Sequence, residues 1–293
     1  MSRPSIPAFL FAFLLLSLQT LHGESSPPNI ILLYADDLGY TDLSCQGSDY
    51  YRTPNIDRLA SEGMTFTHAY AAAANCAPSR ASLMTGLYTP RHGVFTVGNS
   101  DRGKAAHRRL IPVTNQTVLT RTLPTMAQVL KKAGYQTAVA GKWHLSKDPI
   151  PYGFDTNFGG LQWGAPKSYF SPYRNPNLKD GPKGEHLPAR LAQEICSWIN
   201  LAHKKDNPFF VYFPLYSVHT PIQARQDLTA KYEGRSGTHH RNAKYAAMIE
   251  SMDLGVGKIL DLLDKLEIAE DTVVVFTSDN GPHGAFSNAK PLR

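Results

Sequence analysis

Cysteine, charge and long apolar runs are all scarce in this chain. Its 293 residues include 3 cysteines, so at most one disulfide can form and a disulfide framework is excluded. Charged residues make up 18% of the chain, which is too few for a disordered tail. The apolar run at residues 8–18 is shorter than the ~20 residues that a transmembrane helix needs. We therefore expect no stable membrane span.

What is present suits a globular domain with a sizeable core. Hydrophobic residues make up 42% of the sequence, as in ordinary folded domains. Lys and Arg number 30 against 24 Asp and Glu, and this modest excess is spread along the chain. We expect no nucleic-acid partner, whereas an anionic substrate is compatible with the positive balance.

Residues 1–23 have the pattern of a secretory signal peptide. Arg3 precedes the apolar run, polar residues resume at Gln19, and Gly23 suits cleavage. We expect export to the periplasm or the medium, or to the lysosome or extracellular space in a eukaryote. The mature domain is then residues 24–293.

Short apolar runs alternate with helical patterns along the mature chain. Strands are predicted at 29–34, 64–69, 136–140, 208–216 and 272–277. Helices are predicted at 53–62, 79–85, 123–133, 188–203 and 241–266, with a long irregular stretch at 148–187. The alternation predicts an α/β fold whose central, mainly parallel sheet is flanked by helices. In such sheets the functional site lies at the carboxyl ends of the strands.

Oxygen-bearing side chains follow the first and the last predicted strands. Asp36 and Asp37 come after the first, and Asp279 and Asn280 after the last. Adjacent carboxylates repel each other unless a cation lies between them, and hard divalent cations prefer carboxylate and amide oxygens. Each pair alone is typical of a solvated turn; together they predict one cation site.

Cys76 and Arg80 form the most specific feature of the sequence. Cys76 directly precedes a predicted helix, whose N-terminus favours negative charge, and Arg80 offers a planar cation for anionic oxygens. A lone cysteine is usually a small core residue. However, the segment 76–86, CAPSRASLMTG, resembles the signature of the type I sulfatases, the arylsulfatase-like, formylglycine-dependent family. The resemblance extends, in the family's order, to residues 36–37, 141–144, 217–221 and 278–281.

The resemblance implies an alkaline-phosphatase-like sandwich and a sulfatase N-terminal catalytic domain that is incomplete at its C-terminus. The family places a further active-site lysine just after a Pro-Leu-Arg-like segment, and this chain ends at Arg293, before that position. The smaller C-terminal subdomain would also be absent. On this interpretation we expect the 293-residue chain to be inactive or severely impaired beside one of family-typical length.

The resemblance also implies roles for the site residues. Cys76 would be oxidised to formylglycine by a formylglycine-generating or sulfatase-maturing enzyme, and a hydroxyl of the hydrated aldehyde would attack sulfur. Lys142 and Arg80 would hold this group and offset the charge of the sulfate, while His144 would take a proton and His219 would serve the leaving oxygen. Lys142 and His219 would bind substrate. One divalent cation, usually calcium, would be bound by Asp36, Asp37, Cys76, Asp279 and Asn280. Taken alone, residues 141–144 are typical of a surface loop and His219 of a turn.

The expected function is therefore hydrolysis of an aryl or glycan sulfate ester, R–O–SO₃⁻, to an alcohol and sulfate. Two alternatives stay open at this point. One is a phosphonate or phosphate monoester hydrolase of the same superfamily, and the other is a non-catalytic fragment that binds sulfated glycans. The aromatic-rich stretch 163–173 either lines the substrate cleft or packs a loop.

Overall fold

Five parallel strands form one open sheet at the centre of the protein. The computed structural model describes residues 26–288 and residue 290, so the predicted signal peptide and Arg293 lie outside the described residues. The strand order is β3-β2-β4-β1-β5, and every neighbouring pair is parallel. The strands are β1 (Asn29–Ala35), β2 (Gln136–Ala140), β3 (Thr156–Phe158), β4 (Phe209–Pro214) and β5 (Thr272–Ser278).

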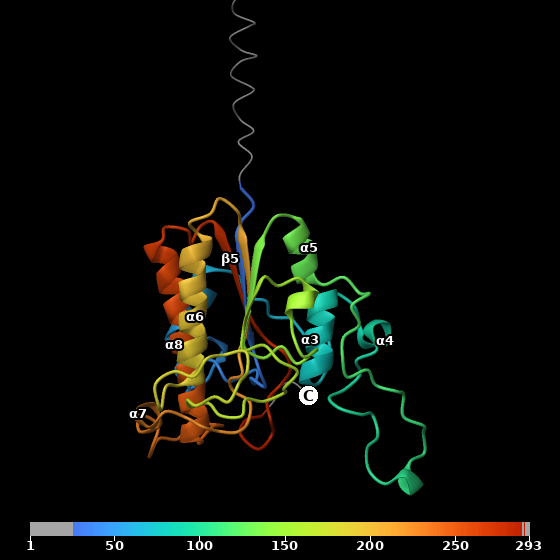
Figure 1. Ribbon diagram of the computed structural model, residues 1–293. Helices are drawn as coiled ribbons and strands as arrows, with labels where there is room; N and C mark the ends of the chain where they lie inside the picture. The colour runs from blue at the N-terminus through green and yellow to red at the C-terminus, as the bar shows by residue number, and fades with distance from the viewer. Residues whose placement is uncertain (1–25, 289, 291–293) are drawn as a thin grey trace, which may run out of the picture.

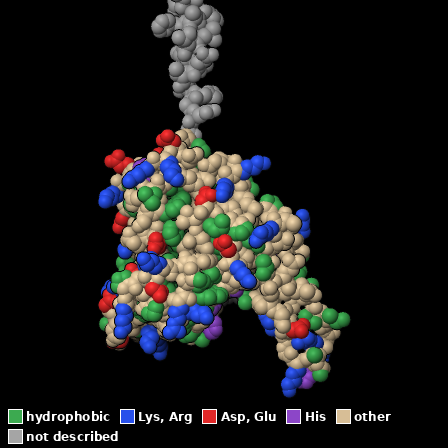
Figure 2. Space-filling model, viewed as in Figure 1, with side chains coloured by type: hydrophobic (Ala, Val, Ile, Leu, Met, Phe, Trp, Pro, Cys, Tyr) green, Lys and Arg blue, Asp and Glu red, His purple; other side chains and the backbone are tan. Residues whose placement is uncertain are grey.

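Helices cover both faces of this sheet (Figure 1). One face carries α2 (Pro54–Glu62), α6 (Leu187–Ala202) and α8 (Ala243–Lys265), and the other carries α3 (Cys76–Thr85) and α5 (Met126–Lys132). The short elements are η1 (Ser44–Gln46), α4 (Thr89–His92), η2 (Ala105–His107), η3 (Ile150–Tyr152) and α7 (Gln226–Thr229). The segment that contains η2 projects away from the body (Figures 1 and 2). The prediction of an α/β fold with a parallel central sheet is confirmed.

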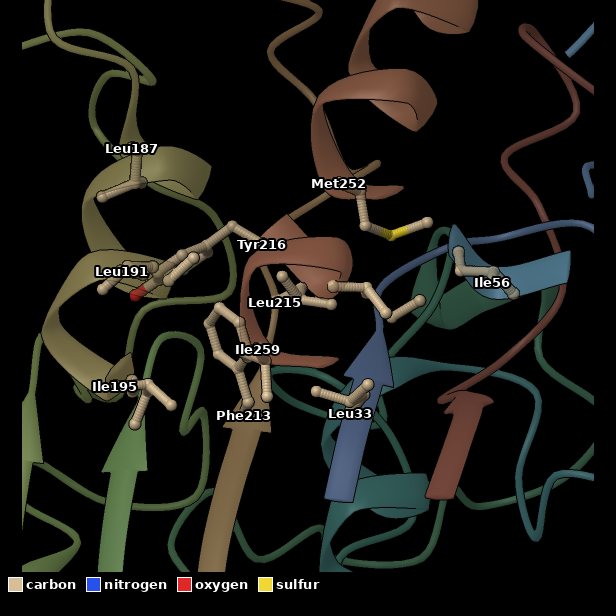
Figure 3. Close-up of a cluster of buried hydrophobic side chains, with 14 of the residues drawn as sticks. Leu33, Ile56, Leu187, Leu191, Ile195, Phe213, Leu215, Tyr216, Met252 and Ile259 are labelled. Atoms are coloured by element: carbon tan, nitrogen blue, oxygen red, sulfur yellow. The ribbon is translucent and has the colours of Figure 1, made fainter. Parts of the chain in front are cut away.

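Residue patterns explain how the sheet is buried. All six residues of β4 are buried, as expected for the middle strand of a sheet covered on both sides. Side chains of β1 alternate between the two cores, because successive residues of a strand point to opposite faces. Ile31 and Leu33 pack with α6 and α8, where Figure 3 shows Leu33 near Phe213 and Ile259. Leu32 and Tyr34 face the smaller core beside α3.

Two details of the predicted elements are wrong. Residues 64–69 form an exposed loop rather than a strand, and the side chains of Met64 and Phe66 are 78% and 72% exposed. The irregular stretch contains the short strand β3, which pairs with β2. In the described part of the chain, no helix is long and apolar enough to cross a membrane.

Candidate active site

The carboxyl ends of β1 and β5 meet, as their sequence pattern predicts. Ala35 lies opposite Ser278 in the sheet, so the residues that follow them enter the same space. The backbone N–H of Asp37 donates to Oδ1 of Asp279 at 3.2 Å, and Nδ2 of Asn280 donates to Oδ1 of Asp37 at 2.6 Å. Two segments about 240 positions apart are thereby joined into one oxygen-rich pocket.

Residue 76 completes this cluster. Ligand atoms of Asp36, Cys76 and Asp279 lie within 4.8 Å of one another, and all three residues are buried. Oδ1 of Asn280 is buried and has no hydrogen-bond partner among the residues that the structure describes. A buried polar atom without a partner is costly, and an amide oxygen beside carboxylates is a suitable ligand for a hard divalent cation. The residues therefore fit the expected cation.

Two fully buried basic side chains, Lys142 and Arg80, bind the carboxylates. Nζ of Lys142 donates to both oxygens of Asp36, at 2.7 and 2.6 Å. Arg80 donates from Nε and Nη2 to Oδ2 of Asp279, and from Nη1 to the Lys142 carbonyl at 2.6 Å. Arg80 and Cys76 lie four residues apart on α3, which places them on one face of the helix.

The local backbone explains how Lys142 reaches the cluster. Gly141, directly after β2, has φ of +114°, and a Cβ there would lie 2.1 Å from the Pro214 carbonyl oxygen. Only glycine fits such a turn at this close approach. The Lys142 N–H then donates to that same carbonyl at 2.7 Å, which ties the loop after β2 to the end of β4.

Burial controls the protonation of this cluster. It raises the pKa of Asp36 well above its ordinary value, against the effect of the Lys142 charge. Burial also opposes ionisation of Asp279, but the charges of Arg80 and Lys142 outweigh it and hold the pKa of Asp279 below its ordinary value. Burial, and then the charge of Asp36, raises the pKa of the Cys76 thiol to about 12. The unmodified thiol is therefore a poor nucleophile at neutral pH.

Both predicted histidines border the cluster. His144 is 8% exposed, and burial followed by the charges of Lys142 and Arg80 lowers its pKa to about 3. Its Nδ1 is buried and has no hydrogen-bond partner within residues 26–288 and 290, so the neutral ring has an unused polar atom. The ring is therefore neutral at neutral pH.

His219 lies on the other side, in the loop after β4. Its Nδ1–H donates to the Thr220 carbonyl at 2.8 Å, which assigns the neutral tautomer and leaves Nε2 for other partners. Nε2 is 3.7 Å from Oδ2 of Asp37. Burial, followed by the charge of Lys142, lowers the pKa of His219 below its ordinary value. All nine predicted site residues thus gather at one end of the sheet.

The residues that hold the Asp37 backbone in place were not identified in the sequence analysis. The hydroxyl of Tyr245 donates to Oδ2 of buried Asp42 at 2.8 Å and lies 3.3 Å from the Asp37 carbonyl oxygen. Asp37 itself has φ of +58°, a conformation that this network helps to hold. The position of Asp42, five residues after Asp37, was the one available signal, whereas nothing in the sequence singles out Tyr245.

Each of the two interpretations of the aromatic stretch 163–173 holds for a part of it. Tyr169 and Tyr173 are buried in the larger core, so these residues pack the loop. Trp163 is half-buried and lies next to Gly164, where a Cβ would be 2.9 Å from His144 Nε2. The start of the stretch therefore borders the candidate site.

Comparisons with known proteins agree with this α/β architecture. The chain belongs to the Sulfatase family, whose model matches residues 28–291. A protein named sulfatase from Formosa agariphila is 36% identical over 97% of this chain and 63% of its own. Mouse N-acetylgalactosamine-6-sulfatase is 36% identical over 88% of this chain and 51% of its own. The chain thus spans between about half and two thirds of the length of these relatives.

Solved structures give the same fold. The crystal structure of Ps i-CgsB in complex with k-i-k-neocarrahexaose matches with a TM-score of 0.77 and 31% identity, over 91% of this chain and 61% of that one. The phosphonate monoester hydrolase of Agrobacterium radiobacter matches with a TM-score of 0.65 at 20% identity, a likeness of fold alone. The expected alkaline-phosphatase-like fold is confirmed by these neighbours.

Proposed function

We propose that the protein hydrolyses sulfate esters, R–O–SO₃⁻, to an alcohol and sulfate at the site around residue 76. The observation that carries this proposal is the buried cluster in which Arg80, Lys142, Asp36 and Asp279 surround Cys76. Membership of the Sulfatase family supports the same reaction class.

A divalent cation, which we propose to be calcium, would be held by residues 36, 37, 76, 279 and 280. When bound, it would stabilise negative charge on the sulfate oxygens. The support for it is the donor set itself: the carboxylates of Asp36 and Asp279 beside residue 76, the carboxylate of Asp37 that is hydrogen-bonded to Asn280, and an Asn280 amide oxygen with no partner in the described part of the chain. Such oxygens suit a hard cation better than a soft one.

We propose that Cys76 is the position oxidised to formylglycine, with a formylglycine-generating or sulfatase-maturing enzyme as the partner that modifies it. The hydrated aldehyde supplies a hydroxyl nucleophile and a second hydroxyl whose loss of a proton lets sulfate leave. The thiol itself is a poor candidate nucleophile, because its pKa is raised to about 12. Residue 76 is the first residue of α3, and its Sγ lies within 4.8 Å of carboxylate oxygens of Asp36 and Asp279.

The remaining residues orient charge and move protons. Arg80 and Lys142 fix the carboxylates and place positive charge beside the sulfate oxygens. His144, which borders the cluster, is the residue that we propose to accept a proton from residue 76, against the burial and neighbouring charges that lower its pKa. We propose that His219, when protonated, donates from Nε2 to the leaving alcohol oxygen; the Asp37 carboxylate at 3.7 Å favours this form, against the burial and the Lys142 charge that lower the pKa of His219.

We also propose that the protein is exported and that residues 24–293 form a sulfatase N-terminal catalytic domain. The support for export is the charge and apolar pattern of residues 1–23. The support for the domain is the family match over residues 28–291.

The function is tested by expressing the chain with a maturing enzyme, beside a version extended to the length of its relatives. Peptide mass measures the oxidation of Cys76, and turnover is compared on p-nitrophenyl sulfate and p-nitrophenyl phosphate. Cys76→Ser is expected to lose sulfatase turnover, whereas Cys45→Ser, at an exposed position, serves as the matched control. Full turnover with an unmodified Cys76 thiol contradicts the mechanism, and faster turnover of the phosphate contradicts the substrate class.

A further inference from the structure

The loop at residues 161–167 is fastened directly to His144. The His144 N–H donates to the Leu161 carbonyl at 2.8 Å. A Cβ placed on Gly164 would lie 2.9 Å from both Cε1 and Nε2 of the His144 ring. The side chain of Gln162 donates from Nε2 to the Thr117 carbonyl at 3.1 Å, which ties the loop to a second segment. The loop therefore has a fixed position at the edge of the site.

This loop carries a cation that is oriented by an aromatic ring. Nζ of Lys167 lies 5.0 Å from the centre of the Trp163 ring, within the range of a cation–π interaction. Lys167 is exposed and Trp163 is half-buried, so the ammonium group faces solvent while the ring anchors it.

The charge of Lys167 has no acidic partner. Among the residues that the structure describes, no carboxylate oxygen lies within 4.0 Å of it, whereas Lys131 and Lys231 each pair with an acid at 2.5 Å. An ammonium group held in place by a neutral ring keeps its capacity to bind an anion. Surface lysines without such an anchor lose more side-chain entropy when they bind.

The distance to the reacting centre limits what this cation can contact. Lys167 follows Gly164 by three residues, so their Cα atoms are at most about 11 Å apart. Since the backbone of Gly164 lies beside the His144 ring, this span keeps Lys167 close enough to meet a substituent of the sugar that carries the scissile sulfate, or of the next sugar. A simple aryl sulfate has no second charged group to place there.

We propose that Trp163 and Lys167 form a specificity-determining subsite for a second acidic group of a glycan substrate, either a sulfate or a carboxylate. The inference rests on the proposed function, because it assigns the class of ester that the site at residue 76 receives. Lys167 binds the anionic oxygens, and Trp163 acts as a positioning residue that holds the ammonium group. The preferred substrate is thus an acidic glycan rather than an ester whose only charge is the scissile sulfate.

The test measures binding separately from turnover. Calorimetry on the Cys76→Ala protein, which has no nucleophile at residue 76, compares N-acetylgalactosamine 6-sulfate, its 4,6-disulfate, and the 6-sulfate linked to glucuronate. Lys167→Gln is expected to weaken binding of the doubly acidic probes about three- to tenfold, and of the mono-sulfate less than twofold. Trp163→Leu should act in the same direction, and Trp163→Phe should keep most of the preference.

Lys183→Gln is the matched control, since it removes the same charge from another exposed position of the long loop. A preference for the disulfate alone identifies sulfate as the second group, and a preference for the glucuronate alone identifies carboxylate. The subsite is refuted if the three probes bind equally, if none binds, or if K167Q weakens all three alike. Turnover of p-nitrophenyl sulfate by the formylglycine-bearing protein reports on the proposed function independently.

Discussion

Arg80 places two N–H donors on a single oxygen of Asp279, from Nε at 3.0 Å and from Nη2 at 2.7 Å. The other oxygen of Asp279 accepts the backbone N–H of Asp37 at 3.2 Å. Asp279 therefore links helix α3 to the loop after β1, and both charged side chains are fully buried. The planar guanidinium is what makes this geometry possible.

Replacing Arg80 by lysine tests this link. Arg80→Lys keeps the charge but loses the planar guanidinium with its several N–H donors. An oxygen of Asp279 or the Lys142 carbonyl is then left buried without a donor. We expect the free energy of unfolding to fall by about 2–4 kcal/mol, as measured by urea denaturation. Arg58→Lys is the control, because its three ion pairs lie on the surface and should contribute less than about 1 kcal/mol. Equal losses in the two variants would refute the argument.

Much of the site could be predicted from the sequence because strand ends in a parallel sheet meet at one edge. The pairs at 36–37 and 279–280 follow apolar runs, and their convergence needed only the assumption that the two strands lie in one sheet. The ion pairing could not be predicted in the same way. That Lys142 binds Asp36 while Arg80 binds Asp279 depends on loop paths such as the turn at Gly141.

The errors in the fold have a common cause. A strand exists only where a neighbour accepts its hydrogen bonds, and short segments do not reveal their neighbours. Residues 64–69 have a suitable composition but pair with no strand that the structure describes, whereas β3 has three residues and pairs with β2. Burial is equally non-local, since Asp42 and Tyr245 meet only after α8 packs behind the loop that follows β1.

Cation binding should raise thermal stability through the same cluster. With calcium at about one hundred times its dissociation constant, the gain is about 2.7 kcal/mol, or a rise in Tm of roughly 5 °C over protein treated with EDTA. Asp37→Ala and Asn280→Ala are expected to abolish this rise, which differential scanning calorimetry measures. Asp261→Ala, which removes an exposed carboxylate from α8, should retain it. A calcium effect of the same size in all four proteins would place the cation elsewhere.

Gly164 should control the position of His144. In Gly164→Ala the new methyl group would lie 2.9 Å from the ring, so the buried imidazole or the loop must shift. Because catalysis is sensitive to displacements of this order, we expect kcat on p-nitrophenyl sulfate to fall at least about tenfold with little change in KM, measured on the formylglycine-bearing protein extended to the length of its relatives. Gly284→Ala is the matched control, since a Cβ there meets no heavy atom within 4 Å. Unchanged kcat in G164A would show that the contact has no catalytic role.

His186 should make the protein less stable in acid. This ring is 5% exposed, and its Nδ1 is hydrogen-bonded to Ser251 Oγ at 2.9 Å. Burial lowers the pKa of His186 from 6.5 to about 4. Between these values the unfolded chain binds a proton that the folded chain refuses, so stability falls as the pH falls from about 6.5 to about 4. The full loss is about 3 kcal/mol, of which about 2 kcal/mol is lost by pH 5.

The titration of the His186 imidazole, rather than its hydrogen bond to Ser251, should cause this pH dependence of the free energy of unfolding. His186→Gln removes the titrating group, so its free energy of unfolding should fall less steeply than that of the wild type when urea denaturation is repeated from pH 7 to pH 4.5. Ser251→Ala removes the 2.9 Å contact but keeps the ring, and it should lose stability at every pH while retaining the wild-type slope. If H186Q shows the wild-type slope, the acid sensitivity belongs to other groups. If S251A flattens the slope as H186Q does, the hydrogen bond and not burial sets the pKa of His186.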